Sequence, residues 1–300
     1  MGQKKNRLQI WAEYVVALVL VQALRWLPLP AANTLARSAT RLLDTVAPKL
    51  RRVARKNLAF ALPNLDGAEH GRIVDGVFES IARVLVALAR FPALNGSNIS
   101  DWIGYEGFEN YQAAKQEGRG VLIATAHLGN WELSAFAHAL MTEPMHVMVR
   151  PLDNPSIDRL VEERRKLSGN CLIDKRDAAR AVIKALRRNE AVGILIDQNT
   201  ATAEGVFVDF FGKPACAGSG FVKLAHRSQA AVIPGFALWN KTQGRYVLRF
   251  YPRVEMTGDV QADTQRLHAA IEDVIRQYPD QWMWIHRRWK TRPAGESPLY

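Results

Sequence analysis

The sequence predicts an α/β fold: a three-layer, acyltransferase-like arrangement of a mixed sheet flanked by helices, led by an N-terminal helical region that associates with a membrane. Three observations predict it. Beyond residue 120, short β-branched apolar runs alternate with segments of helical periodicity. Residues 8–29 form a strongly apolar segment near the N-terminus. The chain has 300 residues, of which 48% are hydrophobic, so a large core can be buried.

The apolar segment 8–29 is too interrupted for an ordinary transmembrane helix. It carries Glu13 and Gln22, and its longest uninterrupted run, residues 14–21, is shorter than a bilayer requires. A helix inserted shallowly in one leaflet does not place a charge in the bilayer core, so this arrangement is favoured. A spanning helix, a cleaved signal peptide and a buried helix of a soluble protein are the alternatives.

The next region is basic. It contains one acidic residue, Asp44, and seven basic residues: Arg37, Arg41, Lys49, Arg51, Arg52, Arg55 and Lys56. Positive charge beside an apolar helix keeps this side of the chain cytoplasmic and suits anionic headgroups. The whole chain has a net charge of +11, which favours an anionic lipid, an acidic protein or a nucleic acid as partner. We expect no nucleic-acid binding, because no recognition motif is present.

The remaining elements follow in order. Residues 73–88 carry a wide apolar stripe, which predicts a core helix or the wall of a cavity. Strands are expected at residues 121–126, 145–149, 191–196 and 231–236, and at the alternating run 246–250. Helices are expected at residues 131–141, 155–167, 178–188 and 220–228, and over a last apolar stripe that Asp263 is expected to cap.

A strand-to-helix corner at residues 127–132 is the strongest candidate for chemistry. His127 follows a predicted strand, and Glu132 falls in the first turn of the next helix. Gly129 permits a sharp turn and Asn130 is a favourable N-cap. At the carboxyl end of a strand, where open α/β sheets bind ligands, Glu132 would orient the imidazole of His127 as a general base. The alternative is a capping corner whose histidine only forms hydrogen bonds.

Several further motifs occur in a recognisable order. They are the stretch 150–155 (Arg-Pro-Leu-Asp-Asn-Pro), the stretch 196–198 (Ile-Asp-Gln), the stretch 210–212 (Phe-Phe-Gly) with Pro214, and the stretch 284–288 (Trp-Ile-His-Arg-Arg) with residues 291–293 (Thr-Arg-Pro). Together with the corner, they resemble the late acyltransferases of lipid A biosynthesis, the lauroyl and myristoyl type. Acyltransferases of phosphatidylinositol mannosides are similar, so the motifs are less specific for the acceptor lipid.

The resemblance implies an O-acyltransferase at the cytoplasmic face of the bacterial inner membrane. It would move a fatty acyl group from acyl carrier protein to a hydroxyl of an anionic glycolipid, a lipid A precursor. Residues 1–29 would be the membrane-associating helix and residues 30–300 the acyltransferase domain. Because no serine or cysteine lies in a nucleophile elbow, we expect direct attack without an acyl-enzyme. We expect no metal and no cofactor.

The resemblance also implies residues that bind substrate. An arginine before Gly169 matches Arg165, or Arg164 in the alternative register, and an aspartate after the strand 191–196 matches Asp197. Asn130 belongs to the same candidate set through its place in the corner. Arg150, at another strand end, is expected to meet a phosphate, or else to pair with a neighbouring carboxylate. The oxyanion would be met by backbone N–H groups of residues 129–131 or by an arginine.

Other functions stay open from the sequence. The chain could acylate another glycolipid, a mannosylated phosphoinositide or an aminolipid, with acyl-CoA as the donor. It could also be a lipid-binding protein that catalyses nothing and uses the same apolar cavity. The aromatic and basic residues of the stretch 282–289 could grip a phosphorylated sugar or simply pack the C-terminal segment.

Overall fold

The computed structural model describes residues 6–174 and 178–300, so the first five residues of the predicted membrane-associating segment 1–29 lie outside it. A seven-stranded sheet forms the centre, in the order β1-β9-β8-β2-β5-β3-β4. Its strands are β1 (Ile103–Glu106), β2 (Val121–Thr125), β3 (His146–Val149), β4 (Cys171–Asp174), β5 (Ala191–Leu195), β8 (Ala231–Asn240) and β9 (Arg245–Phe250). Only the pair β8–β9 is antiparallel among these strands, so the predicted mixed sheet is confirmed.

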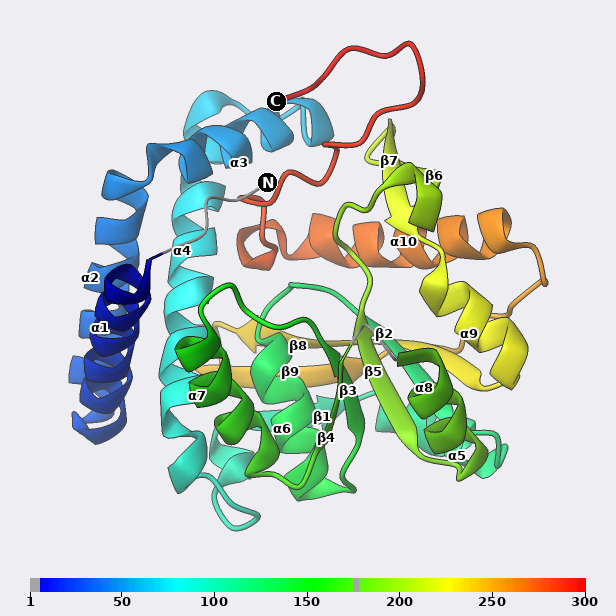
Figure 1. The fold of residues 1–300 in the computed structure, drawn as a ribbon, viewed down its shortest axis with the longest axis horizontal. Coiled ribbons are helices and arrows are strands. Elements are labelled where there is room, and N and C mark those ends of the chain that lie inside the picture. Colours follow the sequence, from blue (N-terminus) through cyan, green and yellow to red (C-terminus); the bar gives the residue numbers. More distant parts are fainter. Residues whose placement is uncertain (1–5, 175–177) are drawn as a thin grey trace.

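The described helices cover both faces and one end of this sheet (Figure 1). They are α1 (Arg7–Trp26), α2 (Leu29–Val46), α3 (Pro48–Ala61), α4 (Gly67–Arg90), α5 (Phe108–Gln116), α6 (Trp131–Met141), α7 (Pro155–Lys166), α8 (Ala178–Arg187), α9 (Gly220–Ser228) and α10 (Val260–Gln277). A hairpin of β6 (Gly205–Phe210) and β7 (Lys213–Gly218) lies outside the main sheet.

Alternation along the strands divides the core into two layers. Leu122 and Val192 pack with residues of α8, α9 and α10 on one face. Ile123 and Ile233 pack with residues of α5 and α6 on the other face. Because successive side chains of a strand point to opposite faces, both faces of the central strands are buried, as their uninterrupted apolar runs require. The three-layer α/β prediction is therefore confirmed.

The N-terminal helices form a separate group at one end of the sheet (Figure 1). The long helix α4 contacts both α1 and α2, and α1 also contacts α7. Leu24 is buried in this contact, whereas the other face of α1 is open. Its large side chains Leu8, Trp11, Val16, Val19 and Trp26 are 61–74% exposed. The alternative of a buried core helix is therefore wrong.

A polar contact fixes α1 against α7. The side-chain nitrogen of Asn154 donates to the backbone oxygen of Ile10 at 2.9 Å and to Glu13 Oε2 at 3.0 Å. The oxygen of the same amide caps the N-terminus of α7 by accepting from the N–H groups of Ser156 and Ile157. Glu13 is thus turned toward the protein, so the charge that interrupts the apolar segment does not lie on its open face.

The last helix begins earlier than expected. Asp259 is the N-cap of α10, since its side chain accepts from the N–H of Ala262. Asp263 lies inside the first turn, is fully buried, and accepts from the N–H groups of Thr257 and Gly258. The predicted cap at Asp263 is therefore wrong: this carboxylate binds the loop that precedes the helix.

The tryptophans of the C-terminal stretch are core residues. Trp282, Trp284 and Trp289 are at most 1% exposed and pack around Phe210 and Phe211. The packing interpretation of this stretch is confirmed for the three indoles. Trp282 also reaches the site described next.

Candidate active site

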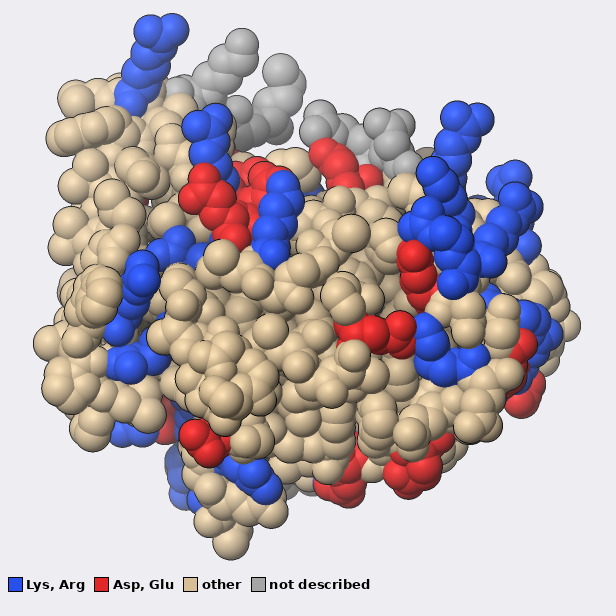
Figure 2. Space-filling view, turned by 90° about the horizontal axis from the view of Figure 1, so that it is seen from below, with Lys and Arg blue, Asp and Glu red and all other residues tan. Residues whose placement is uncertain are grey.

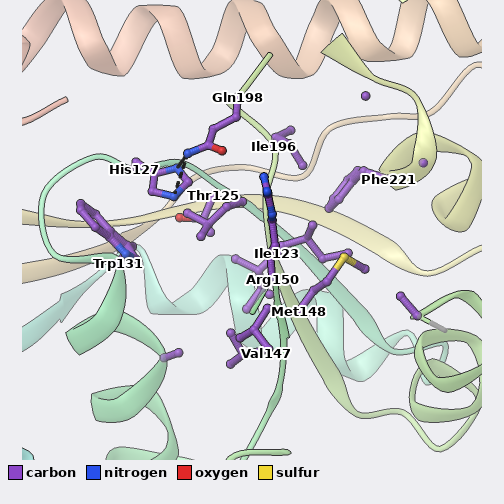
Figure 3. Close-up of a pocket in the computed structure, with 18 of the residues that line it drawn as sticks. Ile123, Thr125, His127, Trp131, Val147, Met148, Arg150, Ile196, Gln198 and Phe221 are labelled. Atoms are coloured by element: carbon purple, nitrogen blue, oxygen red, sulfur yellow. Dashed lines mark hydrogen bonds between the residues drawn. The ribbon is translucent and has the colours of Figure 1, made fainter. Parts of the chain in front are cut away.

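A cavity of about 1000 Å³ opens where β2, β3 and β5 end. Apolar side chains line much of it, including Ile123, Val147, Met148 and Phe221 (Figure 3). His127 and Gln198 point into its upper part. Mostly apolar pockets with a few converging polar groups are typical of ligand sites.

Asp197 is the direct partner of His127. The Nδ1 atom of His127 lies 2.9 Å from Asp197 Oδ1, and the backbone N–H of His127 donates to Asp197 Oδ2 at 3.0 Å. Trp282 Nε1 donates to the same Oδ2 at 2.8 Å. With three donors around it and 2% exposure, the Asp197 side chain is held rigidly. The carboxylate selects the tautomer in which Nδ1 carries the proton and Nε2 is free to accept one.

Burial and charge act in opposite directions on this pair. Burial favours neutral His127, but the attraction and hydrogen bond of Asp197 outweigh it, so the pKa of His127 is raised above its usual 6.5. Burial likewise opposes ionisation of Asp197, yet His127 and the indole N–H of Trp282 hold the pKa of that carboxyl below its usual range. Asp197 is thus a carboxylate at neutral pH, beside an imidazole that titrates above its usual pKa.

Gln198 lies beside the imidazole of His127. Its Nε2 is 3.3 Å from Nε2 and 3.5 Å from Nδ1 of that ring (Figure 3), so it is not aligned with Nε2 alone. The side chain is exposed, so a ligand entering the cavity can displace it. Neither Gln198 nor Trp282 was among the site residues expected from the sequence, although Gln198 directly follows Asp197.

Glu132 does not hold His127. Both of its carboxylate oxygens accept from Arg165, at 2.8 Å from Nε and 2.6 Å from Nη2. The prediction that Glu132 orients the imidazole is therefore corrected to Asp197. The first turn of α6 directs Glu132 toward α7, which carries Arg165. The charge of Glu132 also raises the pKa of His127, but this effect is smaller than those of burial and of Asp197.

Comparison with known proteins shows to which family the chain belongs. Residues 2–291 match the family of bacterial lipid A biosynthesis acyltransferases. The chain belongs to this family. The expectation drawn from the motifs is thereby confirmed, and the protein is an acyltransferase that acts in lipid A biosynthesis.

Individual relatives cover nearly the whole acyltransferase. The lipid A biosynthesis palmitoleoyltransferase of Escherichia coli (strain K12) is 30% identical over 281 residues, which are 92% of this chain and 90% of the relative. The lauroyltransferase of the same organism is 29% identical over 97% of this chain and 94% of its own length. Its myristoyltransferase is 22% identical over 92% and 89%. These relatives are named for different acyl chains.

The three other expected site residues have different positions. Arg150 lines the cavity and is exposed (Figure 3). Arg164 is turned away: it is 6% exposed, its Nη1 donates to the oxygen of Leu160, and the charge of Arg25 on α1 lies near it. Asn130 is fully buried as the N-cap of α6, accepting from the N–H of Leu133. Arg164 and Asn130 are therefore removed from the substrate-binding set of the acyltransferase.

Two of the expected backbone donors for an oxyanion are already used. The N–H of Gly129 donates to the oxygen of Gln281 at 3.0 Å, and that of Asn130 to the oxygen of Ala237 at 2.8 Å. The prediction of an oxyanion hole in this turn fails for these two groups. Arg165 remains, because it lines the cavity and its Nη1 makes no hydrogen bond to another residue that the structure describes. Within residues 6–174 and 178–300, no cluster of side chains could hold a metal ion.

Proposed function

We propose that this protein is a membrane-associated O-acyltransferase that moves a fatty acyl group from an acyl thioester to a hydroxyl of a lipid A precursor. The observation that carries the proposal is the imidazole of His127, held through Nδ1 by Asp197 and directed through Nε2 into an apolar cavity. A thioester with a long chain needs such an apolar cavity, and a hydroxyl acceptor needs such a base.

His127 acts as the general base in this mechanism. The acceptor hydroxyl binds at Nε2 of His127, with Gln198 moved aside, and loses its proton to that nitrogen as its oxygen attacks the thioester carbonyl carbon. A tetrahedral intermediate forms without an acyl-enzyme. When it collapses, the carbon–sulfur bond breaks, and the imidazolium returns the proton to the leaving thiolate. Asp197 stabilises the imidazolium that exists between these two steps.

Two arginines complete the proposed site. Arg165, fixed by its two bonds to Glu132, presents a positive charge where the carbonyl oxygen becomes negative. Arg150, exposed at the end of β3, meets a phosphate of the acceptor. A fixed guanidinium suits a developing charge, because it needs no reorganisation during the reaction, whereas an exposed one suits recognition.

The N-terminal helices place the enzyme on a membrane in this proposal. α1 is long and apolar enough to cross a bilayer by length and composition, and its open face is apolar. α2 adds exposed Leu42, Leu43 and Val46. α2 and α3 also carry exposed basic side chains at this end of the molecule: Arg41, Lys49, Arg52, Arg55 and Lys56. Apolar burial combined with attraction to anionic headgroups favours the cytoplasmic face of the bacterial inner membrane.

The test uses the full-length enzyme in detergent, with lauroyl-acyl carrier protein as donor and a lipid A precursor as acceptor. Transfer should occur with wild type and fall sharply with His127→Ala at an unchanged melting temperature. A strain that lacks the gene should lose one secondary acyl chain from its lipid A. Unchanged lipid A would contradict the proposed acceptor, and full transfer by His127→Ala would contradict the proposed base.

A further inference from the structure

A group of basic side chains on α8 and α9 has no role in the mechanism above. We call it the α8–α9 basic patch; it consists of Arg180, Lys184 and Arg187 on α8 and Lys223 and Arg227 on α9. All five are exposed. Their spacing of three or four residues puts them on one face of each helix, while Val182 and Leu186 on the other face of α8 are buried.

The patch borders the active-site cavity. Lys223 and Arg227 line the same cavity as His127, and so do Ala178 and Ala179 at the start of α8. α8 and α9 are in contact with each other, so the basic residues of both helices lie around one end of the cavity. A partner bound there could reach the imidazole through the cavity itself.

Within the described residues, no ion pair neutralises the charge of the patch. None of the five side chains forms an ion pair with another residue in the described part of the chain. Glu190, near the end of α8, is already bound to Arg188 and His146. Glu204 also lines the cavity and has an interaction of its own. A surface with several unpaired cations attracts an anionic partner and steers its approach.

The position of the patch separates it from the proposed membrane surface. α8 and α9 lie at the end of the molecule away from α1 and α2 (Figure 1), and Figure 2 shows basic side chains gathered at that end. Most of the large exposed apolar side chains of the described chain lie on α1 and α2, and neither α8 nor α9 contributes one. A charged surface without apolar side chains suits a soluble partner rather than a bilayer.

We propose that the α8–α9 basic patch is the docking surface for an acidic carrier protein that presents the acyl chain as a thioester on a flexible arm. This inference rests on the proposed function, because it identifies how the donor reaches the same cavity. The carrier binds on the side away from the membrane, and its arm enters the cavity past Lys223 and Arg227 and extends toward His127.

The test compares two donors with one pair of variants. Arg180→Glu combined with Lys184→Glu reverses two patch charges that do not line the cavity. Arg72→Glu combined with Arg266→Glu makes the same change in charge on exposed residues of α4 and α10, which have no proposed role in catalysis or membrane binding, and is the matched control. The donors are lauroyl-acyl carrier protein and lauroyl-pantetheine, which has the same thioester without a protein. We expect the KM for the carrier donor to rise about tenfold or more in the patch variant only, with unchanged use of lauroyl-pantetheine.

Three other results would overturn the inference. An unchanged KM for the carrier donor in the patch variant would show that the carrier docks elsewhere. A loss with both donors, or a loss of binding to anionic vesicles, would assign the patch to the acceptor or the membrane. If the wild-type enzyme uses neither donor, the proposed function fails and this inference fails with it. If the wild-type enzyme transfers normally but the patch variant has the same KM as the control, only this inference fails.

Discussion

His127 and Asp197 occupy equivalent positions on neighbouring parallel strands. The last paired residues of β2 and β5 are Thr125 and Leu195, so each of the two side chains lies two residues beyond the end of its strand. Parallel strands bring their carboxyl ends to one edge of the sheet, and this register brings Nδ1 of His127 to 2.9 Å from the carboxylate. The pairing of the two strands therefore assembles the base with its orienting group.

Replacing His127 with Ala should lower kcat by about 10²–10⁴, or roughly 3–5 kcal/mol of activation free energy, because the base for the hydroxyl proton is lost. Turnover of lauroyl-acyl carrier protein by purified variants measures this, beside thermal melts. The double variant with Asp197→Asn should be little worse than His127→Ala alone, since residues that act as a unit are not additive. A collapsed melt would instead assign His127 a structural role.

The pH dependence should follow the pKa of His127. Because the base must be neutral, kcat/KM should increase as pH rises through that pKa, which Asp197 holds above 6.5. Asp197→Asn removes the attraction for the imidazolium but keeps the burial, so the pKa falls and the rising limb moves to lower pH. The maximal rate should also drop, by up to about 10⁴-fold, because the tautomer is no longer fixed. A limb that stays in place would exclude His127 as the titrating group.

Arg165→Ala should lower both kcat and stability. It leaves Glu132, whose side chain is only 11% exposed, without its two charged hydrogen bonds, at a cost of about 1–3 kcal/mol. Arg159→Ala removes an exposed arginine from the same helix and should change neither quantity. In a double-mutant cycle with Glu132→Ala, the two losses of stability should not add. Additive losses would show that the pair is not coupled.

Val16→Glu combined with Val19→Glu should weaken membrane association without unfolding the protein, because both side chains are more than 60% exposed. Release should be partial at low salt and greater at high salt, since the exposed basic residues of α2 and α3 still bind anionic headgroups. Fractionation at two ionic strengths measures this, with Val16→Ile and Val19→Leu as the apolar control. Unchanged fractionation of the glutamate variant would exclude the open face of α1 as the anchor.

Gly193→Val should shorten the preferred acyl chain. A Cβ atom at Gly193 would lie 2.9 Å from Cε of Met145, and both residues line the cavity. The added methyl groups therefore displace Met145 or occupy the cavity directly. Competition between long and short acyl donors should show a selective loss of the long ones. An equal loss for all lengths at a normal melting temperature would place the chain elsewhere.

Local patterns predicted the elements well but not the contacts between them. The helix 131–141 has the expected bounds, because an apolar stripe and an N-cap act within a few residues. Asp197 was expected near the site from the family resemblance and from its place at a strand end, but not as the partner of His127. The hydrogen bond between Asp197 and His127 depends on β5 lying beside β2, and the sequence of neither segment predicts the strand order.

Two differences between the expected and the observed site have geometric causes. Gly129 adopts a φ of +64°, and the sharp turn that follows places Glu132 on the side of α6 that faces α7. A spacing of five residues along the sequence could not reveal this. Arg164 and Arg165 differ by about 100° around their helix, so one faces α1 and the other Glu132. The charge run alone could not decide between them.

The amide of Asn154 links α1, the proposed membrane helix, to α7, which carries the proposed catalytic group Arg165. Its nitrogen is held by α1, its oxygen begins α7, and the other end of α7 carries Arg165. Trimming α1 to obtain a more tractable protein would leave this buried amide without two acceptors and loosen the helix that supports the guanidinium. Low activity in a shortened, detergent-free preparation would then report a damaged scaffold rather than a missing membrane. Under the proposed function, proteolytic removal of α1 in the cell would both release the enzyme from the membrane and lower its activity.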